Sequence, residues 1–419
     1  MFWGILLAAI IILGASSSRC RPDSTLPADT DLKLLPGFHA TVIAELGRST
    51  PRHIVVTKEG DVYVKLDRLQ NGKGILFLRE KGDGTYQTIS SFGDYRGTGI
   101  ALKNGYLYAS SDVAIYRYKL NDKDEVVDPE HPETIVQGLL DRHEHTSKSI
   151  ILDDAGNLYT NIGAYSNDCQ VQDRVAGSPG RRPCPILDSA GGIWQFKADQ
   201  SNQTYGNGTR YATGLRNVVG LDWNTATNTL WVMQHGRDQF FENYPNLYSQ
   251  EQGNELPAEC LYELHNGSNC GWPYIYWDQF QHKKILNPEY GGDGKMTAEP
   301  DAQDPVVAFP GHLAPNGLLF YTGKQFPDKY RNGAFIVFHG SWNRQPEEKG
   351  YDVQFVPFSG NKPTADPVVF ADNFAGENPI PTPNSAKHRP CGIAQGPDGS
   401  LFVTDDQGGT IYKITYTGK

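Results

Sequence analysis

Two short polar clusters in this sequence combine residue types that move protons or hold anions. His143, Glu144 and His145 lie in the run HEHTSKS. An imidazole titrates near neutral pH and can accept a hydroxyl proton, and an adjacent carboxylate can orient it or raise its basicity. Arg216 and Asn217 lie in GLRN and offer planar donors to a carboxylate or a quinone oxygen. The two clusters predict a base and an anion-binding group.

Two further clusters contain candidate metal and ring-binding groups. Gly236 and Arg237 lie in QHGRD, where glycine permits a sharp turn that exposes main-chain carbonyls. Hard cations such as Ca²⁺ take such oxygens. The run HGSWNR extends from His339 to Arg344 and includes Trp342, which could stack on a flat ring or a sugar. A surface turn or a structural ion pair is the alternative interpretation of each cluster.

The clusters flank copies of a repeated pair of strands. Each copy is an aliphatic strand, a turn with Gly or Asn, and a second strand of the type Leu/Val-aromatic-Val/Ala. The Gly or Asn supplies a positive φ at the turn, and alternating apolar residues turn one face of each strand inward. Five copies and a degenerate one, fifth in chain order, occupy residues 54–64, 100–109, 150–160, 220–232, 317–338 and 392–403.

The repeat predicts an all-β fold, a six-bladed β-propeller formed by residues 30–419. Several copies carry a third strand, and a hairpin followed by another hairpin is a propeller blade. Six copies give about 60 residues per blade, with extra length in insertions at 168–189, 239–304 and 341–386. Insertions on one rim of a rigid scaffold usually build the active site. A β-sandwich is the alternative, which six even repeats disfavour.

Four arginines occupy similar positions at the blade rims. Arg96, Arg216, Arg344 and Arg389 each lie next to one repeat copy. If their guanidinium groups converge on one axial site, that site suits a planar ligand with several negative charges. The net charge of −10 argues against a nucleic-acid partner, because phosphate binding is driven by Lys and Arg.

The N-terminus predicts export. Residues 1–19 hold an apolar run followed by small residues, as in a secretory signal peptide, and Cys20 comes directly after Arg19. A lipidated Cys20 would attach the protein to a bacterial membrane; otherwise it would be periplasmic or extracellular. An uncleaved membrane anchor is the alternative. The cysteines fit an oxidising compartment: Cys169 with Cys184, and Cys260 with Cys270, could close as local disulfides, leaving Cys391 unpaired and buried.

An ordered series of motifs resembles the pyrroloquinoline quinone (PQQ)-dependent glucose/sorbosone dehydrogenase family, nearer its sorbosone and pyranose branch. The resemblance spans about Leu35 to Tyr416 and is carried by RYATGLRN, HGRDQF, NCGWPY, APNG, FHGSWNRQP and HRPCGIAQGPDGSLFVTDD. It implies a six-bladed propeller that binds PQQ and Ca²⁺ and oxidises a sugar or a sugar-derived aldehyde to a lactone or an acid. An external acceptor, such as a cytochrome or a quinone, would reoxidise the cofactor.

The resemblance also implies residue roles. His145 resembles the general base, with His143 as its competitor, and Glu144 resembles the acidic partner of that base. Arg216 resembles a catalytic contact to the quinone oxygens, together with Asn217. The other implied cofactor contacts are Arg389 on a carboxylate and His339 or Arg344 in the fifth blade. The family's Gln near the second blade has no clear counterpart, because Asp94 or Arg96 occupies that place; Arg96 is the candidate cofactor contact there. The main-chain carbonyls of Gly236 and Arg237 would hold Ca²⁺.

Two other functions are compatible with an exported propeller. A calcium-dependent lactonase would need carboxylate ligands crowding the axis, whereas the positions here are Arg and His. A non-catalytic propeller that binds carbohydrate or protein is the second, because a fold alone does not fix a function.

Overall fold

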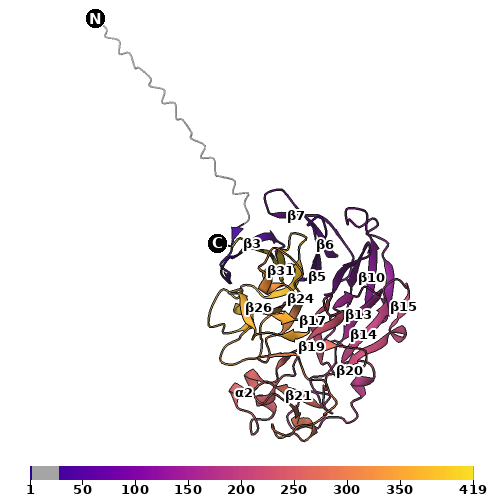
Figure 1. The fold of residues 1–419 in the computed structure, drawn as a ribbon, viewed down its shortest axis with the longest axis vertical. Coiled ribbons are helices and arrows are strands. Elements are labelled where there is room, and N and C mark those ends of the chain that lie inside the picture. The colour runs from indigo at the N-terminus through magenta and orange to yellow at the C-terminus, as the bar shows by residue number, and fades with distance from the viewer. Residues whose placement is uncertain (2–27, 419) are drawn as a thin grey trace.

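Six β-sheets, each the blade of a propeller, make up most of the molecule in the computed structural model (Figure 1). The structure describes Met1 and residues 28–418; the predicted signal peptide and Cys20 lie outside this part of the chain. The sheet count confirms the predicted six-bladed β-propeller. The repeat copies supply the two innermost strands of each blade, as their alternating apolar residues indicated.

The first three blades follow one another along the chain. Blade 1 is β4 (Pro51–Val56), β5 (Val62–Gln70), β6 (Lys73–Glu80) and β7 (Tyr86–Phe92). Blade 2 is β8 (Ile100–Lys103), β9 (Tyr106–Ser110), β10 (Ala114–Lys119), β11 (Glu133–Gln137) and the short β15 (Gln203–Thr204). Blade 3 is β12 (Ile150–Leu152), β13 (Asn157–Ile162), β14 (Gly192–Lys197), β16 (Thr209–Thr213) and β20 (Ser268–Asn269).

Blades 4 to 6 complete the ring, and blade 6 joins the two ends of the described chain. Blade 4 is β17 (Asn217–Asn224), β18 (Thr229–His235), β19 (Glu259–Leu264) and β23 (Val307–Phe309). Blade 5 is β24 (Pro315–Phe320), β25 (Ala334–Phe338), β26 (Asp352–Val356), β29 (Val368–Asp372) and β2 (Lys33–Leu34). Blade 6 is β30 (Pro390–Gln395), β31 (Leu401–Asp405), β32 (Thr410–Tyr416), β3 (Phe38–Glu45) and β1 (Ala28–Asp29). Because β3 pairs with β32, hydrogen bonds close the ring of blades (Figure 1).

The inner strands β4, β8, β12, β17, β24 and β30 lie next to one another around the axis. A Cβ atom at Gly392 on β30 would stand 2.4 Å from the Arg52 carbonyl, so this narrow ring requires glycine there. Apolar side chains fill the space between blades. Trp231 on β18 is fully buried and packs on Phe320 and Phe358, which joins blade 4 to blade 5.

The predicted insertions contain more regular structure than expected. The segment 239–304 includes the blade strand β19 as well as α1 (Phe240–Asn243), α2 (Gln250–Glu255), β21 (Ile275–Asp278) and β22 (Lys283–Leu286). The segment 341–386 includes the blade strands β26 and β29 and the hairpin of β27 (Phe358–Ser359) and β28 (Lys362–Pro363). Helical 3-10 turns lie at Pro185–Asp188, Tyr205–Asn207, Pro288–Tyr290, Asp328–Tyr330 and Pro383–Ser385. In the described residues no helix has the length and apolar character to cross a membrane.

One predicted disulfide forms and the other does not. Cys169 and Cys184 are bonded and close a loop with a sequence separation of 15 residues. Cys260 and Cys270 are both free and buried, so the expectation that they could pair is wrong. Both thiols lie in one apolar cluster between blades 3 and 4. Cys391 is free and buried, as predicted.

Candidate functional site

His145 presents one ring nitrogen as a free base. It ends the loop before β12, and its Nδ1 donates to the Ala164 carbonyl at 2.5 Å. A carbonyl only accepts, so Nδ1 carries the proton and Nε2 keeps its lone pair. Burial, reinforced by the positive charge of Arg216, lowers the pKa of His145 to about 3. The imidazole is therefore neutral throughout the physiological pH range and competent to accept a proton.

The backbone around His145 is specified tightly. Its φ of 51° lies in the left-handed region, which few non-glycine residues adopt. A Cβ atom on Gly163 would stand 2.5 Å from the His145 Cβ and 3.2 Å from Asn217 Oδ1. Glycine at this position therefore lets the loop approach the start of β17, where Asn217 lies.

The neighbours of His145 point elsewhere. The side chain of His143 is 95% exposed and lies beside Asp141, 3.7 Å away, so His143 does not compete for the position of the base. Glu144 accepts a hydrogen bond at 2.9 Å from Arg174, a residue that the sequence interpretation did not consider. Any effect of Glu144 on His145 is thus exerted through its charge and through this ion pair.

Arg216 is buried among acceptors. Its Nε donates to the Asn167 carbonyl at 3.2 Å, Nη1 to the Gly236 carbonyl at 2.8 Å, and Nη2 to Asp238 Oδ2 at 2.8 Å. The adjacent Asn217 side chain is buried, and its Oδ1 has no hydrogen-bond partner among the described residues. A buried amide oxygen without a partner is costly, which makes it a candidate contact for a ligand.

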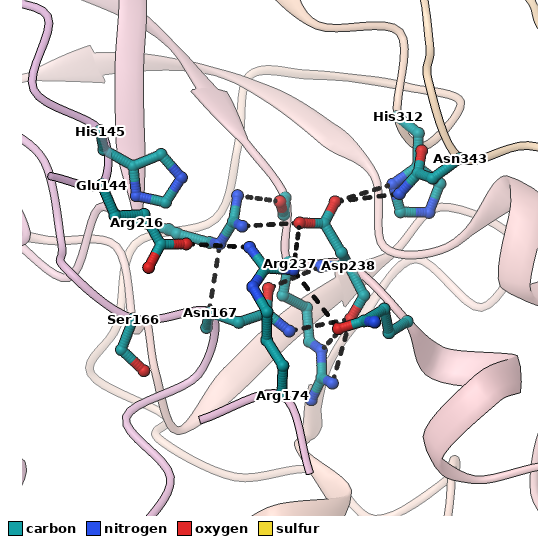
Figure 2. Close-up of polar contacts among 12 residues, drawn as sticks. Glu144, His145, Ser166, Asn167, Arg174, Arg216, Arg237, Asp238, His312 and Asn343 are labelled. Atoms are coloured by element: carbon teal, nitrogen blue, oxygen red, sulfur yellow. Dashed lines mark hydrogen bonds and ion pairs between the residues drawn. The ribbon is translucent and has the colours of Figure 1, made fainter. Parts of the chain in front are cut away.

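Asp238 joins the elements of this site (Figure 2). Its main chain exchanges two hydrogen bonds with the Asn167 side chain, at 2.9 and 3.0 Å. Its carboxylate meets Arg216 and, at 3.1 Å each, Arg174 and Asn343. Burial alone would raise the pKa of Asp238, but Arg216 and His312 bring it well below its usual range. Asp238 is therefore a buried anion held by side chains from several blades.

Arg237 uses its side chain to anchor the turn. The guanidinium is 1% exposed and pairs with Asp168 at 3.2 Å and with Glu289 at 2.5 Å. The Gly236 amide donates to Glu259 Oε2 at 3.0 Å. These contacts fix the main chain of the 236–238 turn and leave the Arg237 guanidinium unavailable to a ligand.

A second group of charged residues comes from blades 5, 6 and 1. His339 Nε2 lies 2.7 Å from Asp406, which also accepts from Arg52 at 2.6 Å. Arg389 donates to the His339 carbonyl at 3.1 Å and to the Gly340 carbonyl at 2.7 Å. No carboxylate pairs with Arg389 in residues 28–418. We call this group the arginine side and His145, Arg216 and Asp238 the histidine side.

Two of the four rim arginines do not reach either side, so the predicted convergence is corrected for them. Arg344 is 2% exposed and donates to the carbonyls of Asn254 and Gly311 at 2.5 and 2.8 Å. Its two terminal nitrogens are therefore occupied by the end of α2 and by Gly311, while the buried Nε has no partner among the described residues. Arg96 is exposed and pairs with Asp112 at 3.0 Å, in a pocket shared with no other predicted site residue.

A family model matches residues 32–417, most of the printed sequence, under the description TrAA12-like. The chain belongs to the TrAA12-like family. Among curated proteins, it is 24% identical to a "Pyrroloquinoline quinone-dependent sugar dehydrogenase" of Hypocrea jecorina, covering 88% of this chain and 86% of that protein. An uncharacterised protein of Borreliella burgdorferi is 25% identical, covering 92% of this chain and 91% of the relative.

Solved structures of similar proteins share the fold. The calcium structure of the Trichoderma reesei family AA12 enzyme has a TM-score of 0.71 at 20% identity, covering 94% of this chain and 98% of that one. The holo PQQ domain of pyranose dehydrogenase from Coprinopsis cinerea has a TM-score of 0.70 at 19% identity, covering 93% and 98%. These likenesses confirm the propeller architecture.

Sequence reasoning missed part of this TrAA12-like site. Asn167 and Arg174 lie in an insertion without a recognisable motif, and His312 lies in a loop that no repeat marks. Asp238 was visible as the last residue of QHGRD, where a carboxylate beside exposed carbonyls is a signal for a charged site. Asn343, within HGSWNR, is the contact that joins the fifth blade to Asp238.

Proposed function

We propose that this chain is a PQQ-dependent dehydrogenase that oxidises a sugar or a sugar-derived aldehyde and passes the electrons to an external acceptor, such as a cytochrome or a quinone. The observation that carries the proposal is that the histidine side offers a free base and the arginine side offers a positive charge that is unpaired in the described chain. His145 has a free Nε2 next to Arg216, and Arg389 has a positive charge that no carboxylate of the described chain neutralises. The names of the TrAA12-like relatives support the same assignment.

The residues present fit PQQ. This cofactor is a flat ortho-quinone with three carboxylates, so it needs several cationic donors around one plane. Arg389 donates only to carbonyl groups, which leaves its charge available to a carboxylate. Arg52 Nε, Asn217 Oδ1 and Asn343 Oδ1 are buried atoms without a partner among the described residues. Arg216, Asn217, His339 and Arg389 are the residues that would hold PQQ.

The 236–238 turn fits Ca²⁺ in part. Its carbonyls and the Asp238 carboxylate are the hard oxygen atoms that this ion prefers. The Gly236 carbonyl, however, already accepts a hydrogen bond from Arg216. When bound here by the main chain of Gly236 and Arg237, Ca²⁺ would add positive charge next to the quinone oxygens.

The chain's own groups account for the proton and for the developing charge. His145 Nε2 accepts the proton of the substrate hydroxyl, while the Nδ1 bond to Ala164 holds the ring in the right tautomer. Arg216 is fixed by three acceptors and presents a preorganised positive charge beside this base. When bound, PQQ supplies the two-electron acceptor for the hydrogen that leaves the substrate carbon.

The remaining predictions are part of the proposal. Residues 30–419 form one propeller domain, and the N-terminal segment exports it to the periplasm or the cell exterior, with attachment through Cys20 where that residue is lipidated. The rival is an exported propeller that binds carbohydrate or protein without catalysis. The free base at His145 favours the enzyme, because its Nε2 keeps an unbonded lone pair beside Arg216.

The test combines cofactor binding and turnover. Purified protein is titrated with PQQ, with and without CaCl₂, and the absorbance of the bound quinone is followed. Dye-linked oxidation of aldoses, sorbosone and rarer pyranoses is then measured for the wild type and His145→Ala, with the exposed His143→Ala as the matched control. Quinone binding together with oxidation that His145→Ala alone abolishes supports the proposal. Failure to bind PQQ under any condition favours the non-catalytic propeller.

A further inference from the structure

Arg174 carries a positive charge into the histidine side from a loop outside the blades. The loop lies between Cys169 and Cys184, whose disulfide ties its ends. Arg174 Nη2 donates to Glu144 at 2.9 Å, and Nη1 donates to Asp238 Oδ2 at 3.1 Å and to Gln239 at 3.3 Å. Figure 2 shows the Arg174 and Arg216 guanidinium groups reaching the same Asp238 carboxylate.

The loop is built to hold Arg174 in this position. The Arg174 amide donates to Gln170 Oε1 at 2.9 Å, and the Gln170 amide group donates to the carbonyls of Val175 and Ser178. Asp173 accepts from the Asn167 amide at 2.9 Å. Arg174 itself has a φ of 60°, a left-handed conformation that an arginine keeps only where surrounding contacts determine it.

The charges around Asp238 leave little room for a metal ion. Asp238 Oδ2 already accepts from two guanidinium groups, and the Gly236 carbonyl accepts from one of them. A divalent cation on these oxygens would meet the partly exposed Arg174 as a like charge beside the buried Asp238 carboxylate. Arg174 and the ion are therefore alternative sources of positive charge at one place.

We propose that Arg174 is a resident cation of the site: it supplies beside Asp238 the charge that a divalent ion would otherwise bring. This inference rests on the proposed function for its effect on the cofactor. Arg174 then supports the binding of anionic PQQ in the absence of metal and opposes the binding of Ca²⁺. Its role in the reaction is to position Glu144 and Asp238 and to contribute charge.

The first experiment measures PQQ affinity by absorbance or by quenching of protein fluorescence, for wild type and Arg174→Gln, in EDTA and in millimolar CaCl₂. We expect Arg174→Gln to weaken PQQ binding at least about tenfold in EDTA and less than about threefold in Ca²⁺. The matched control is Arg181→Gln, an exposed arginine of the same loop whose side chain donates to the Val171 carbonyl, and it should change neither value. Equal losses in both buffers, or no loss in EDTA, would overturn the proposal.

The second experiment uses Ca²⁺ alone and needs no cofactor. Isothermal titration of the apo-protein should show Ca²⁺ binding at least about tenfold tighter in Arg174→Gln than in the wild type, with Arg174→Lys near the wild type. Unchanged Ca²⁺ affinity in Arg174→Gln overturns the proposal. Thermal melting in EDTA verifies folding, and Arg174→Met is the replacement if the glutamine variant does not fold. If no form binds PQQ, the proposed function fails, yet this titration still decides the role of Arg174.

Discussion

The histidine side and the arginine side, both near the start of inner strands, differ in the charged partners of their arginines. On the histidine side, Arg216 and Arg174 share the Asp238 carboxylate and Arg174 also pairs with Glu144, so both guanidinium groups have carboxylate partners, and His145 is neutral with a free Nε2. On the arginine side, Asp406 is taken by His339 and Arg52, and Arg389 meets only carbonyls. The difference supports the proposal that the histidine side accepts a proton and the arginine side binds an anion.

The largest expected effect separates the two sides at His145. His145→Ala removes the proton acceptor and should lower kcat about 10³-fold, the upper part of the range for a general base. The affinity for PQQ should change less than about threefold, because the anion is held mainly by the arginine side. Steady-state kinetics and PQQ titration measure the two quantities. If kcat and the affinity for PQQ fall together, the histidine side binds the cofactor as well, and the two sides do not have separate roles.

An arginine outside both sides should act on stability alone. Arg344→Met removes the donor for the Asn254 and Gly311 carbonyls and the partner of Glu255. Urea unfolding should show a loss of about 3 kcal/mol, since buried acceptors are left unpaired. The folded fraction should keep the PQQ affinity of the wild type. A selective loss of PQQ binding with unchanged stability would restore Arg344 to the cofactor site.

Replacing Arg389 should have the reverse effect of replacing His145: the affinity for PQQ should fall while kcat changes little. Arg389→Ala removes the uncompensated charge of the arginine side and should weaken PQQ binding about 10- to 100-fold, as expected for a charged hydrogen bond to a carboxylate. At saturating PQQ, kcat should stay within about threefold of the wild type. Arg389→Lys keeps the charge and should recover part of the affinity. An unchanged dissociation constant would place the cofactor carboxylates elsewhere.

Most of the fold could be predicted because the inner hairpins repeat. The copies at 54–64, 100–109, 150–160, 220–232, 317–338 and 392–403 became the two innermost strands of the blades. Outer strands such as β19 and β26 carry no repeat signal, since β19 is buried along its whole length and lacks alternation. Such strands are specified by neighbours that are distant in the sequence, and they were therefore assigned to insertions.

The position of a residue in the fold was predictable where it adjoins a repeat copy. His145, Arg216 and Arg389 precede inner strands, and the strand frame alone brings them near the axis. Arg174 depends on a disulfide-closed loop, and His312 depends on acceptors from the segment around α2. Arg344 shows the opposite error: its place beside a strand end is correct, but its side chain turns to carbonyls that the sequence could not reveal.

The smallest expected effect is a nearly flat response to acid, which sharpens the assignment of the base. A base with the ordinary histidine pKa of about 6.5 would keep only about 3% of its neutral form at pH 5. Burial and Arg216 lower the pKa of His145 to about 3, so the active neutral form persists as pH falls through 6.5. The holoenzyme's kcat/KM should therefore change less than about threefold between pH 8 and pH 5. Arg216→Gln removes the nearby positive charge and should move the acid limb to higher pH, whereas the exposed His143→Ala should not move it. A wild-type acid limb near pH 6.5 would mean that the proton acceptor is a solvated group, and His145 would lose its place as the base.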